Sequence, residues 1–254
     1  MALTDCIYYW KCDEASGARI ATLGGNNLSV YNSASYIDTS SEGRLGRCAD
    51  WYGQWSPSWD NTGICLSTAS AIPISTFIGP WTINLWIHTG KVWGTWGYEI
   101  LSHWNVYGTD TGTVSTNFGS GSGNGTVYFK TCGADGAYHN LGSSAPCLLS
   151  RWHMLTFTYD NSNKAKNIYI NGINRGSATA SHTNNLGTGG NEYLSTSRIG
   201  SPGAAYGGYR GSVKYQHISI FPTAKTQVDI DILYNNSAGL AYPFFDGKAL
   251  QMRS

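Results

Sequence analysis

The chain has 254 residues, only 12% of them charged, and a formal net charge of +1 at pH 7. A near-neutral chain without runs of Lys and Arg lacks the electrostatic basis for nonspecific nucleic-acid binding. No run of about 18 apolar residues is present, so we expect no membrane insertion either.

Glycine is abundant, with 32 residues, and aromatic residues make up 13% of the chain. Low charge with many Gly, Ser, Thr and Asn residues is typical of all-β proteins with tight turns, and the aromatic content argues against disorder. A chain of this length can form one β-sandwich domain. We therefore expect a single domain.

The first predicted strand covers residues 6–12, with Cys6, Tyr8, Trp10 and Cys12 on one face. A second strand, residues 81–88, alternates between two faces. Its apolar face carries Ile83, Leu85 and Ile87, and its other face carries Thr82, Asn84, Trp86 and His88. We interpret the apolar face as core and the other face as a surface that could hold a ligand.

Further strands are predicted at residues 98–104, 126–130, 152–159, 167–170 and 214–221, with a glycine-serine hairpin loop at 119–125. Asn171-Gly172 is a residue pair favoured in type I′ hairpin turns. Residues 226–234 place Ile230, Leu233 and Tyr234 at helical spacing before Asn235 and Gly239. The chain thus predicts two packed antiparallel sheets and one short helix.

Six cysteines stand at 6, 12, 48, 65, 132 and 147, without a Cys-x-x-Cys pair. Their spacing is not compact, and a chain of this length does not need disulfide staples. We expect free, buried thiols, and Cys132 with Cys147 is the pair most worth testing.

Trp152-His-Met-Leu-Thr-Phe-Thr-Tyr-Asp160, followed by Ile168-Tyr-Ile-Asn-Gly172, is one of several segments that together resemble a known family. This family is the concanavalin A-like lectin/glucanase superfamily in its laminin-G-like form, of the type found in phage and bacterial surface proteins. The segment 152–160 with 168–172 is similar to the family's Trp-His-x-x-x-x-x-Tyr-Asp and Tyr-x-Asn-Gly pair. The other similar segments are 9–17, 43–51, 81–87, 199–200 and 233–243.

The resemblance implies an all-β fold, a two-sheet antiparallel jelly-roll sandwich with one short helix near the C-terminus. It implies a domain over residues 1–243 and a C-terminal tail over 244–254. The tryptophans at family framework positions are expected in the core: Trp10, Trp51, Trp81 and Trp152. One departure is Gln216-His217, where the family often carries an acidic pair.

Glucanases of this fold carry Glu-x-Asp-x-x-Glu on one strand, and retaining glycosidases need two carboxylates about 5–5.5 Å apart. The four glutamates here, at 14, 42, 99 and 192, are followed two residues later by Ser16, Arg44, Leu101 and Leu194. The catalytic strand is missing, so we expect no enzyme. A divergent glycoside hydrolase with Glu99 as acid is the alternative, although a structural role for Glu99 is favoured.

Nine of the ten tryptophans lie in the first 104 residues, several of them among Gly, Ser, Thr and Asn. Indole rings in polar loops stack on the C–H faces of sugars, although any single large aromatic is more often a core residue. We expect stacking by Trp55, Trp59, Trp93, Trp96 and Tyr98. The lesser candidates on sheet faces are Asn84, Trp86, His88 and His103.

The leading hypothesis is therefore a noncatalytic glycan-binding or adhesion module whose partner is a glycan or cell-surface polysaccharide. A structural virion decoration or tail-associated protein, bound to other virion proteins, is the alternative. Without a charged-then-apolar leader at Met1–Asp5, we expect a virion or extracellular surface location. No cofactor is expected; calcium is the one metal left open, with Asp50, Asp60 and Asn61 as weak candidates.

Overall fold

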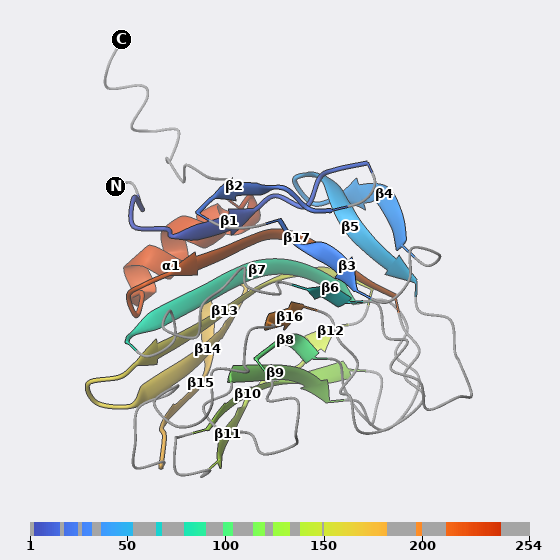
Figure 1. Ribbon diagram of the computed structural model, residues 1–254. Coiled ribbons are helices and arrows are strands. Elements are labelled where there is room, and N and C mark those ends of the chain that lie inside the picture. Colours follow the sequence, from blue (N-terminus) through green and yellow to red (C-terminus); the bar gives the residue numbers. More distant parts are fainter. Residues whose placement is uncertain are drawn as a thin grey trace.

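The structure, a computed structural model, describes residues 3–15, 18–24, 27–31, 37–52, 65–67, 79–89, 99–103, 114–119, 124–132, 138–148, 150–181, 197–199 and 212–239. These residues form two antiparallel sheets that face each other, with one short helix outside them (Figure 1). The predicted all-β sandwich is thus confirmed. The domain boundary predicted at residue 243 lies outside the described residues.

The first sheet runs in the order β15-β14-β13-β7-β17-β1-β2, with β5 on β17 and β4 on β5. Its strands are β1 (Tyr8–Trp10), β2 (Ala21–Leu23), β4 (Ile37–Gly43), β5 (Gly46–Tyr52), β7 (Trp81–Thr89), β13 (Trp152–Asp160), β14 (Ala165–Ile170), β15 (Ile173–Thr179) and β17 (Ser212–Phe221).

The second sheet runs in the order β11-β10-β9-β8-β16-β6-β3, with β12 on β10. Its strands are β3 (Ser29–Tyr31), β6 (Cys65–Ser67), β8 (Glu99–His103), β9 (Val114–Gly119), β10 (Asn124–Cys132), β11 (Tyr138–Gly142), β12 (Cys147–Leu148) and β16 (Ser197–Ile199). The predicted hairpin at 119–125 is confirmed, because Gly119 pairs with Thr126.

The main core lies between the sheets. Ile83, Leu85 and Ile87 of β7 point into it, as their alternation predicts, and Trp81 joins them. Across the gap, Phe129 of β10 meets the Trp81 ring edge-on, with ring centroids 5.4 Å apart. Aromatic pairs in this arrangement add stability beyond the area they bury.

One charged side chain, Lys166 of β14, crosses this core. It is fully buried, and its ammonium donates to Phe129 O and His139 O at 2.8 Å and to Thr131 Oγ1 at 3.2 Å. The three acceptors take all three N–H donors of the ammonium and link β14 to β10 and β11. Burial lowers the pKa of Lys166 to about 7, because no water remains to solvate its charge.

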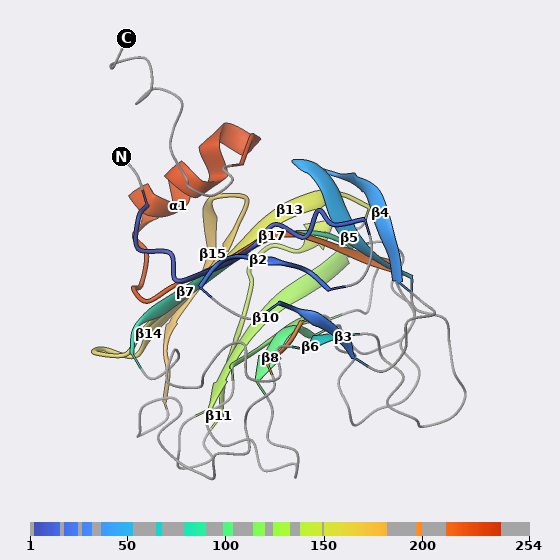
Figure 2. The ribbon, with the colours of Figure 1, turned by 45° about the horizontal axis from the view of Figure 1, so that its top comes forward.

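A second apolar cluster covers the outer face of the first sheet. Helix α1 (Gln227–Tyr234), followed by the 3₁₀ turn Asn235–Ser237, lies over this face (Figure 2). The cluster is formed by Leu3, Cys6, Tyr9, Trp86, Met154, Tyr169, Phe221, Ile230 and Leu233. The predicted strand over 6–12 is therefore wrong in one respect, because Cys6 packs in this outer cluster and Trp10 packs in the inner one.

The predicted helix is confirmed, and local chemistry fixes both of its ends. Thr226 and Asp229 form a capping box at its start, in which each side chain bonds to the other residue's backbone N–H. Asn235 ends the helix in the left-handed conformation, with φ of 46°. In the part of the chain that the structure describes, no helix is long and apolar enough to cross a membrane.

The Gln216-His217 pair forms an irregularity in β17. Gln216 Oε1 accepts from Leu45 N–H at 3.0 Å and its Nε2 donates to Arg47 O at 2.6 Å, which ties β17 to the β4–β5 hairpin. His217 adopts φ of 51°, and its Nδ1 is hydrogen-bonded to the Tyr9 hydroxyl. Burial lowers the pKa of His217 to about 4. At this point the chain has a structural link in place of the family's acidic pair.

Three cysteines in the described part are buried, free thiols: Cys6, Cys12 and Cys147. Burial raises the pKa of the Cys6 and Cys147 thiols to about 12, which makes both poor nucleophiles. Cys48 is buried as well, and the side chains of Cys65 and Cys132 lie outside the described residues. Because Cys147 is free, the Cys132–Cys147 disulfide is not formed here.

Candidate ligand-binding site

Several strands of the first sheet begin or end at the same edge of the sandwich, which we call the rim. Val213 near the start of β17 pairs with Thr89 at the end of β7 on one side and with Trp51 near the end of β5 on the other. His88 pairs in turn with Trp152, the first residue of β13. Neighbouring strands lie about 4.8 Å apart, so these four strand ends span about 15 Å.

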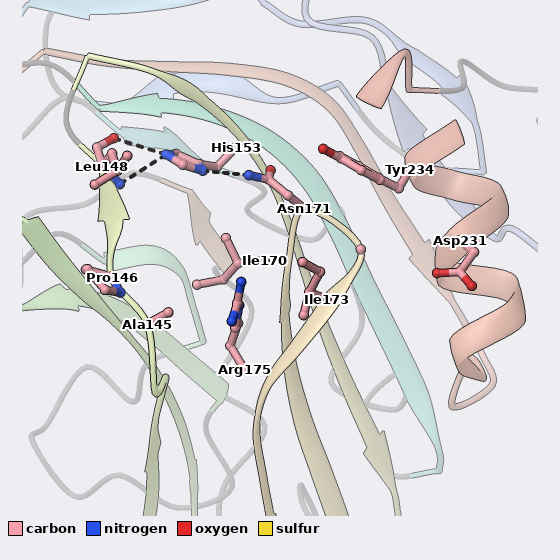
Figure 3. A pocket seen from close by; sticks show the side chains of 11 residues that line it. Ala145, Pro146, Leu148, His153, Ile170, Asn171, Ile173, Arg175, Asp231 and Tyr234 are labelled. Atoms are coloured by element: carbon pink, nitrogen blue, oxygen red, sulfur yellow. Dashed lines mark hydrogen bonds between the residues drawn. The ribbon is translucent and has the colours of Figure 1, made fainter. Parts of the chain in front are cut away.

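A cavity of about 500 Å³ opens at the same rim, one strand further along the sheet. The β14–β15 turn, which lines the cavity, lies at this rim because Asn171 N–H donates to Met154 O, near the start of β13, at 2.9 Å. The walls come from the loop before β12, the start of β13, the β14–β15 turn and helix α1 (Figure 3). They are Ala145, Pro146, Leu148, His153, Ile170, Asn171, Gly172, Ile173, Arg175, Asp231 and Tyr234.

The back of the cavity is a rigid pair, His153 and Asn171. Asn171 Oδ1 accepts from Met154 N–H at 2.9 Å, which orients the amide, so its Nδ2 donates to His153 Nδ1 at 3.1 Å. His153 Nδ1 must then carry the lone pair and Nε2 the proton. Nε2 lies 3.1 Å from both N and O of Leu148, and in this tautomer it donates to the carbonyl (Figure 3).

Burial holds His153 in this neutral form and lowers its pKa; the hydrogen bond to Leu148 opposes the shift, and the charge of Arg151 adds to it. After these bonds the His153 ring has no free donor for a ligand, whereas the Asn171 amide keeps one Nδ2–H.

The positively charged side chain that lines the cavity belongs to Arg175 of β15. Its backbone is anchored, because Ser144 N–H donates to Arg175 O at 2.6 Å and thereby joins the two layers at their edge. Its side chain lies between the Ala145–Pro146 segment and the β14–β15 turn (Figure 3). The guanidinium has no ion-pair or hydrogen-bond partner among the described residues.

The helix supplies the opposite wall. Gln227 Nε2 donates both to Gly172 O and to Asp231 Oδ1 at 2.7 Å, which fixes α1 against the turn and leaves Asp231 Oδ2 for a ligand. The Tyr234 ring packs on Gly172 on one side and stacks on Trp86, with centroids 6.2 Å apart. Between the two walls, the Ile173 side chain is 53% exposed.

Two of the sheet-face residues predicted to hold a ligand are covered instead. Trp86 is 2% exposed beneath Tyr234 and Gly239, and Asn84 is 3% exposed, with its Oδ1 accepting from Thr156 Oγ1 at 2.7 Å. The expectation of an open ligand face is therefore wrong for these two residues. The alternation identified this face as distinct, but helix α1 packs on it, and the sequence does not show which face a helix covers.

The other predicted site residues stand as follows. His88 is half-buried at the rim, where its ring contacts Trp152 at 5.5 Å between centroids. The backbone of His103 ends β8 opposite Ser197, and its side chain is not described. The remaining predicted residues lie outside the described residues: Trp55, Trp59, Trp93, Trp96 and Tyr98.

Of the framework tryptophans, Trp10 and Trp81 are fully buried in the core, as predicted. Trp152 is half-buried at the rim, against the outer cluster. Trp51 lies in β5, and its side chain is not described.

The described carboxylates do not form a hydrolytic pair at the cavity. Asp231 is the one acidic residue that lines it. Glu14 has a structural role, because its Oε1 accepts from Ile20 N–H at 2.7 Å and its carbonyl accepts from Arg19 at 3.1 Å. Glu99 begins β8, and its side chain is not described.

The weak calcium candidates are not tested by the described side chains. Asp50 pairs with Lys214 in the sheet, whereas Asp60 and Asn61 lie outside the described residues. Across the residues that are described, no three His, Cys, Asp or Glu side chains gather as metal ligands.

Three residues that line the cavity were not predicted as site residues from the sequence: Arg175, Asp231 and Tyr234. The turn at Asn171-Gly172 and the helical spacing at 226–234 located their elements. The contact between helix and turn depends on the Gln227 bond to Gly172 O, across 55 residues, and no local pattern indicates it.

Comparisons with known proteins place the fold. No curated protein matches the sequence. The binding domain of paraclostridial mosquitocidal protein 1 is similar in structure, with a TM-score of 0.65 and 13% identity over 92% of this chain and 52% of that chain. The binding domain of botulinum neurotoxin serotype G gives 0.63 and 14%, over 91% and 51%. This chain thus spans about half the length of these two domains.

A third similar structure matches over nearly its whole length. It is domain 4 of AbnA, a GH43 extracellular arabinanase from Geobacillus stearothermophilus, in complex with arabinotriose. The TM-score is 0.60 with 15% identity, over 89% of this chain and 96% of that domain. At the level of sequence, the family profile of the concanavalin A-like lectin/glucanases matches residues 61–231. The chain therefore belongs to the concanavalin A-like lectin/glucanases superfamily.

Proposed function

We propose that this protein is a noncatalytic carbohydrate-binding module that recognises a glycan at the rim of its sandwich. The observation that carries the proposal is the shared position of two features. The open cavity lies at the same sheet end as Tyr52 and Thr89, from which the two tryptophan-rich segments depart.

Chain length limits how far the predicted stacking residues can lie from this rim. Trp55 follows Tyr52 by three residues and Trp93 follows Thr89 by four. A fully extended chain advances at most about 3.6 Å per residue, so these two Cα atoms lie within about 11 and 14 Å of the strand ends. We propose that their indoles stack on sugar rings, with Trp59, Trp96 and Tyr98 extending the same surface.

The comparisons support the binding part of this proposal. Domain 4 of AbnA, which shares the fold over nearly its whole length, was solved in complex with arabinotriose, and the two toxin structures are binding domains. The lack of a Glu-x-Asp-x-x-Glu strand supports the noncatalytic part, because glycoside hydrolysis needs two carboxylates. No observation favours the virion alternative, which stays a prediction.

A glycan array probed with the full chain tests the proposal, followed by tryptophan-fluorescence titration of each positive saccharide. We expect saturable binding to a subset of saccharides. Trp93→Ala and Trp55→Ala should weaken that binding, whereas Trp93→Tyr keeps a stacking ring and should retain most of it. Thermal unfolding of each variant checks that the fold is intact.

Two results would contradict the proposal. Absence of binding to every saccharide on the array would remove the glycan-binding function. Release of reducing sugar from a bound glycan, abolished by Glu99→Gln, would replace a binding module by the divergent hydrolase.

A further inference from the structure

We propose that the cavity between Arg175 and the Ala145–Leu148 segment binds the carboxylate of a uronic acid residue, with Arg175 as its partner. The inference rests on the proposed carbohydrate-binding function and names the class of sugar. It uses the described cavity residues alone.

The first observation is the unused guanidinium. Arg175 lines the cavity, and among the described residues no carboxylate or carbonyl accepts from its side chain. Its backbone is held by the 2.6 Å bond from Ser144 N–H, so the side chain starts from a fixed position. A guanidinium presents paired N–H donors in a planar fork that matches the two oxygens of a carboxylate.

The second observation is that the neighbouring polar groups do not compete for this cation. The Asn171 oxygen is bonded to Met154 N–H, and His153 Nδ1 accepts from the Asn171 amide. Both are committed to each other and to the backbone. Among the described residues no neighbouring acceptor therefore occupies the half-buried guanidinium, which leaves it available to an anionic ligand.

The third observation is the local charge. Arg175 is the cationic side chain that lines the cavity, and the charge of Arg151, which is exposed and does not line it, lowers the pKa of His153. The single carboxylate of the cavity, Asp231, belongs to helix α1 on the other side of the β14–β15 turn, where Gln227 holds it (Figure 3). The Arg175 side of the cavity thus carries net positive charge, which favours an anionic ligand.

The shape and polarity fit a sugar acid rather than a small inorganic anion. At about 500 Å³ the cavity falls within the range of about 300–1,000 Å³ typical of ligand sites. Leu148 and Ile173 expose aliphatic surface beside Arg175, which can pack against the C–H face of a pyranose. Asp231 Oδ2 and the Tyr234 hydroxyl can bond sugar hydroxyl groups on the helix side.

Calorimetric titration of the full chain with three matched trisaccharides tests the inference: trigalacturonate, its methyl ester and neutral galactotriose. We expect trigalacturonate to bind about tenfold more tightly than the ester, because the ester cannot form a charge-assisted pair. Arg175→Gln should remove that preference, and Arg175→Lys should restore it only in part, since the fork is lost. Arg47→Gln, the same change on the β4–β5 hairpin, should leave all affinities unchanged.

Equal binding of the acid and its ester by the wild type would overturn the inference. So would an Arg175→Gln variant, folded by its melting temperature, that keeps the preference for the acid. Tight binding of sulfated but not of uronate saccharides would overturn the carboxylate assignment. If array saccharides bind but none of these effects occurs, the inference fails while the proposed function stands; if no saccharide binds, both fail.

Discussion

The imidazole of His153 is held in a single neutral tautomer by the Asn171 amide, and this arrangement sets how the cavity responds to pH. Protonation of Nδ1 would direct its N–H against the Nδ2 donors of Asn171. The folded-state pKa of His153 lies below its ordinary value of 6.5. Because the unfolded chain then binds the proton more strongly, the contribution of His153 to stability is complete above pH 6.5 and is lost as pH falls.

Replacing Asn171 by Asp should reverse the pKa shift of His153. Aspartate keeps the acceptor for Met154 N–H and tolerates the left-handed backbone of the turn, where φ is 53°. Its second oxygen would face Nδ1 as an acceptor and favour the imidazolium, so we expect the pKa of His153 to rise above 6.5. NMR titration of the histidine ring protons measures the change.

The His153 resonance can be assigned with a His153→Gln variant. A pKa that stays below 6.5 in Asn171→Asp would show that the amide does not fix the tautomer. The sequence indicated His153 only as part of a framework Trp-His pair, because its partner Asn171 lies 18 residues away.

At the scale of elements, the β14–β15 turn is the part that positions the candidate site. Gly172 adopts φ of +78°, and an added Cβ would lie 3.0 Å from Cδ1 of the Tyr234 ring. This glycine is needed both for the turn and for the close approach of α1.

We expect Gly172→Ala to destabilise the protein for both reasons. The left-handed backbone alone costs an L-residue about 1–2 kcal/mol, and the contact with Tyr234 adds to that cost. A double-mutant cycle with Tyr234→Ala, read by chemical denaturation, separates the two. The cost of Gly172→Ala should be smaller in the Tyr234→Ala background; an identical cost in both would show that the helix does not press on the turn.

The elements themselves could be predicted, because each follows from short-range patterns. Alternation identified β7, Asn171-Gly172 identified the hairpin, and helical spacing followed by Asn235 and Gly239 located α1. The cover over Trp86 could not be predicted, since an alternating face with Trp and Asn is equally compatible with solvent, a ligand or a helix. β1 is shorter than the predicted strand. It pairs with residues 218–220 of β17, whereas β5 pairs with residues 212–215 along the same edge.

On the scale of the whole molecule, Lys166 links the two sheets at a cost that depends on pH. Its pKa is about 7 in the folded protein and about 10.5 when exposed, so between these values the unfolded chain holds more protons. Stability must therefore rise with pH across this range. From pH 7 to 9 the gain from this residue is about 2–3 kcal/mol, at about 1.4 kcal/mol per unit.

A Lys166→Met variant tests this prediction. Methionine keeps the apolar stem but removes the charge. The unfolding free energy of the wild type minus that of the variant should therefore increase from pH 7 to pH 9 by about 2–3 kcal/mol. Urea denaturation at several pH values measures it. The thiols and tyrosines titrate in both proteins and cancel in the comparison. A difference that does not change with pH would show that Lys166 keeps its proton throughout.

The central claim, that a glycan docks at the rim shared by the cavity and the departing tryptophan segments, is tested most directly by an amide NMR titration with the tightest saccharide from the array. We predict that shifts concentrate at residues 144–148, 152–153, 171–175 and 231–234. Shifts confined to the β13–β14 turn at 161–164, at the opposite end of the sheet, would contradict the claim.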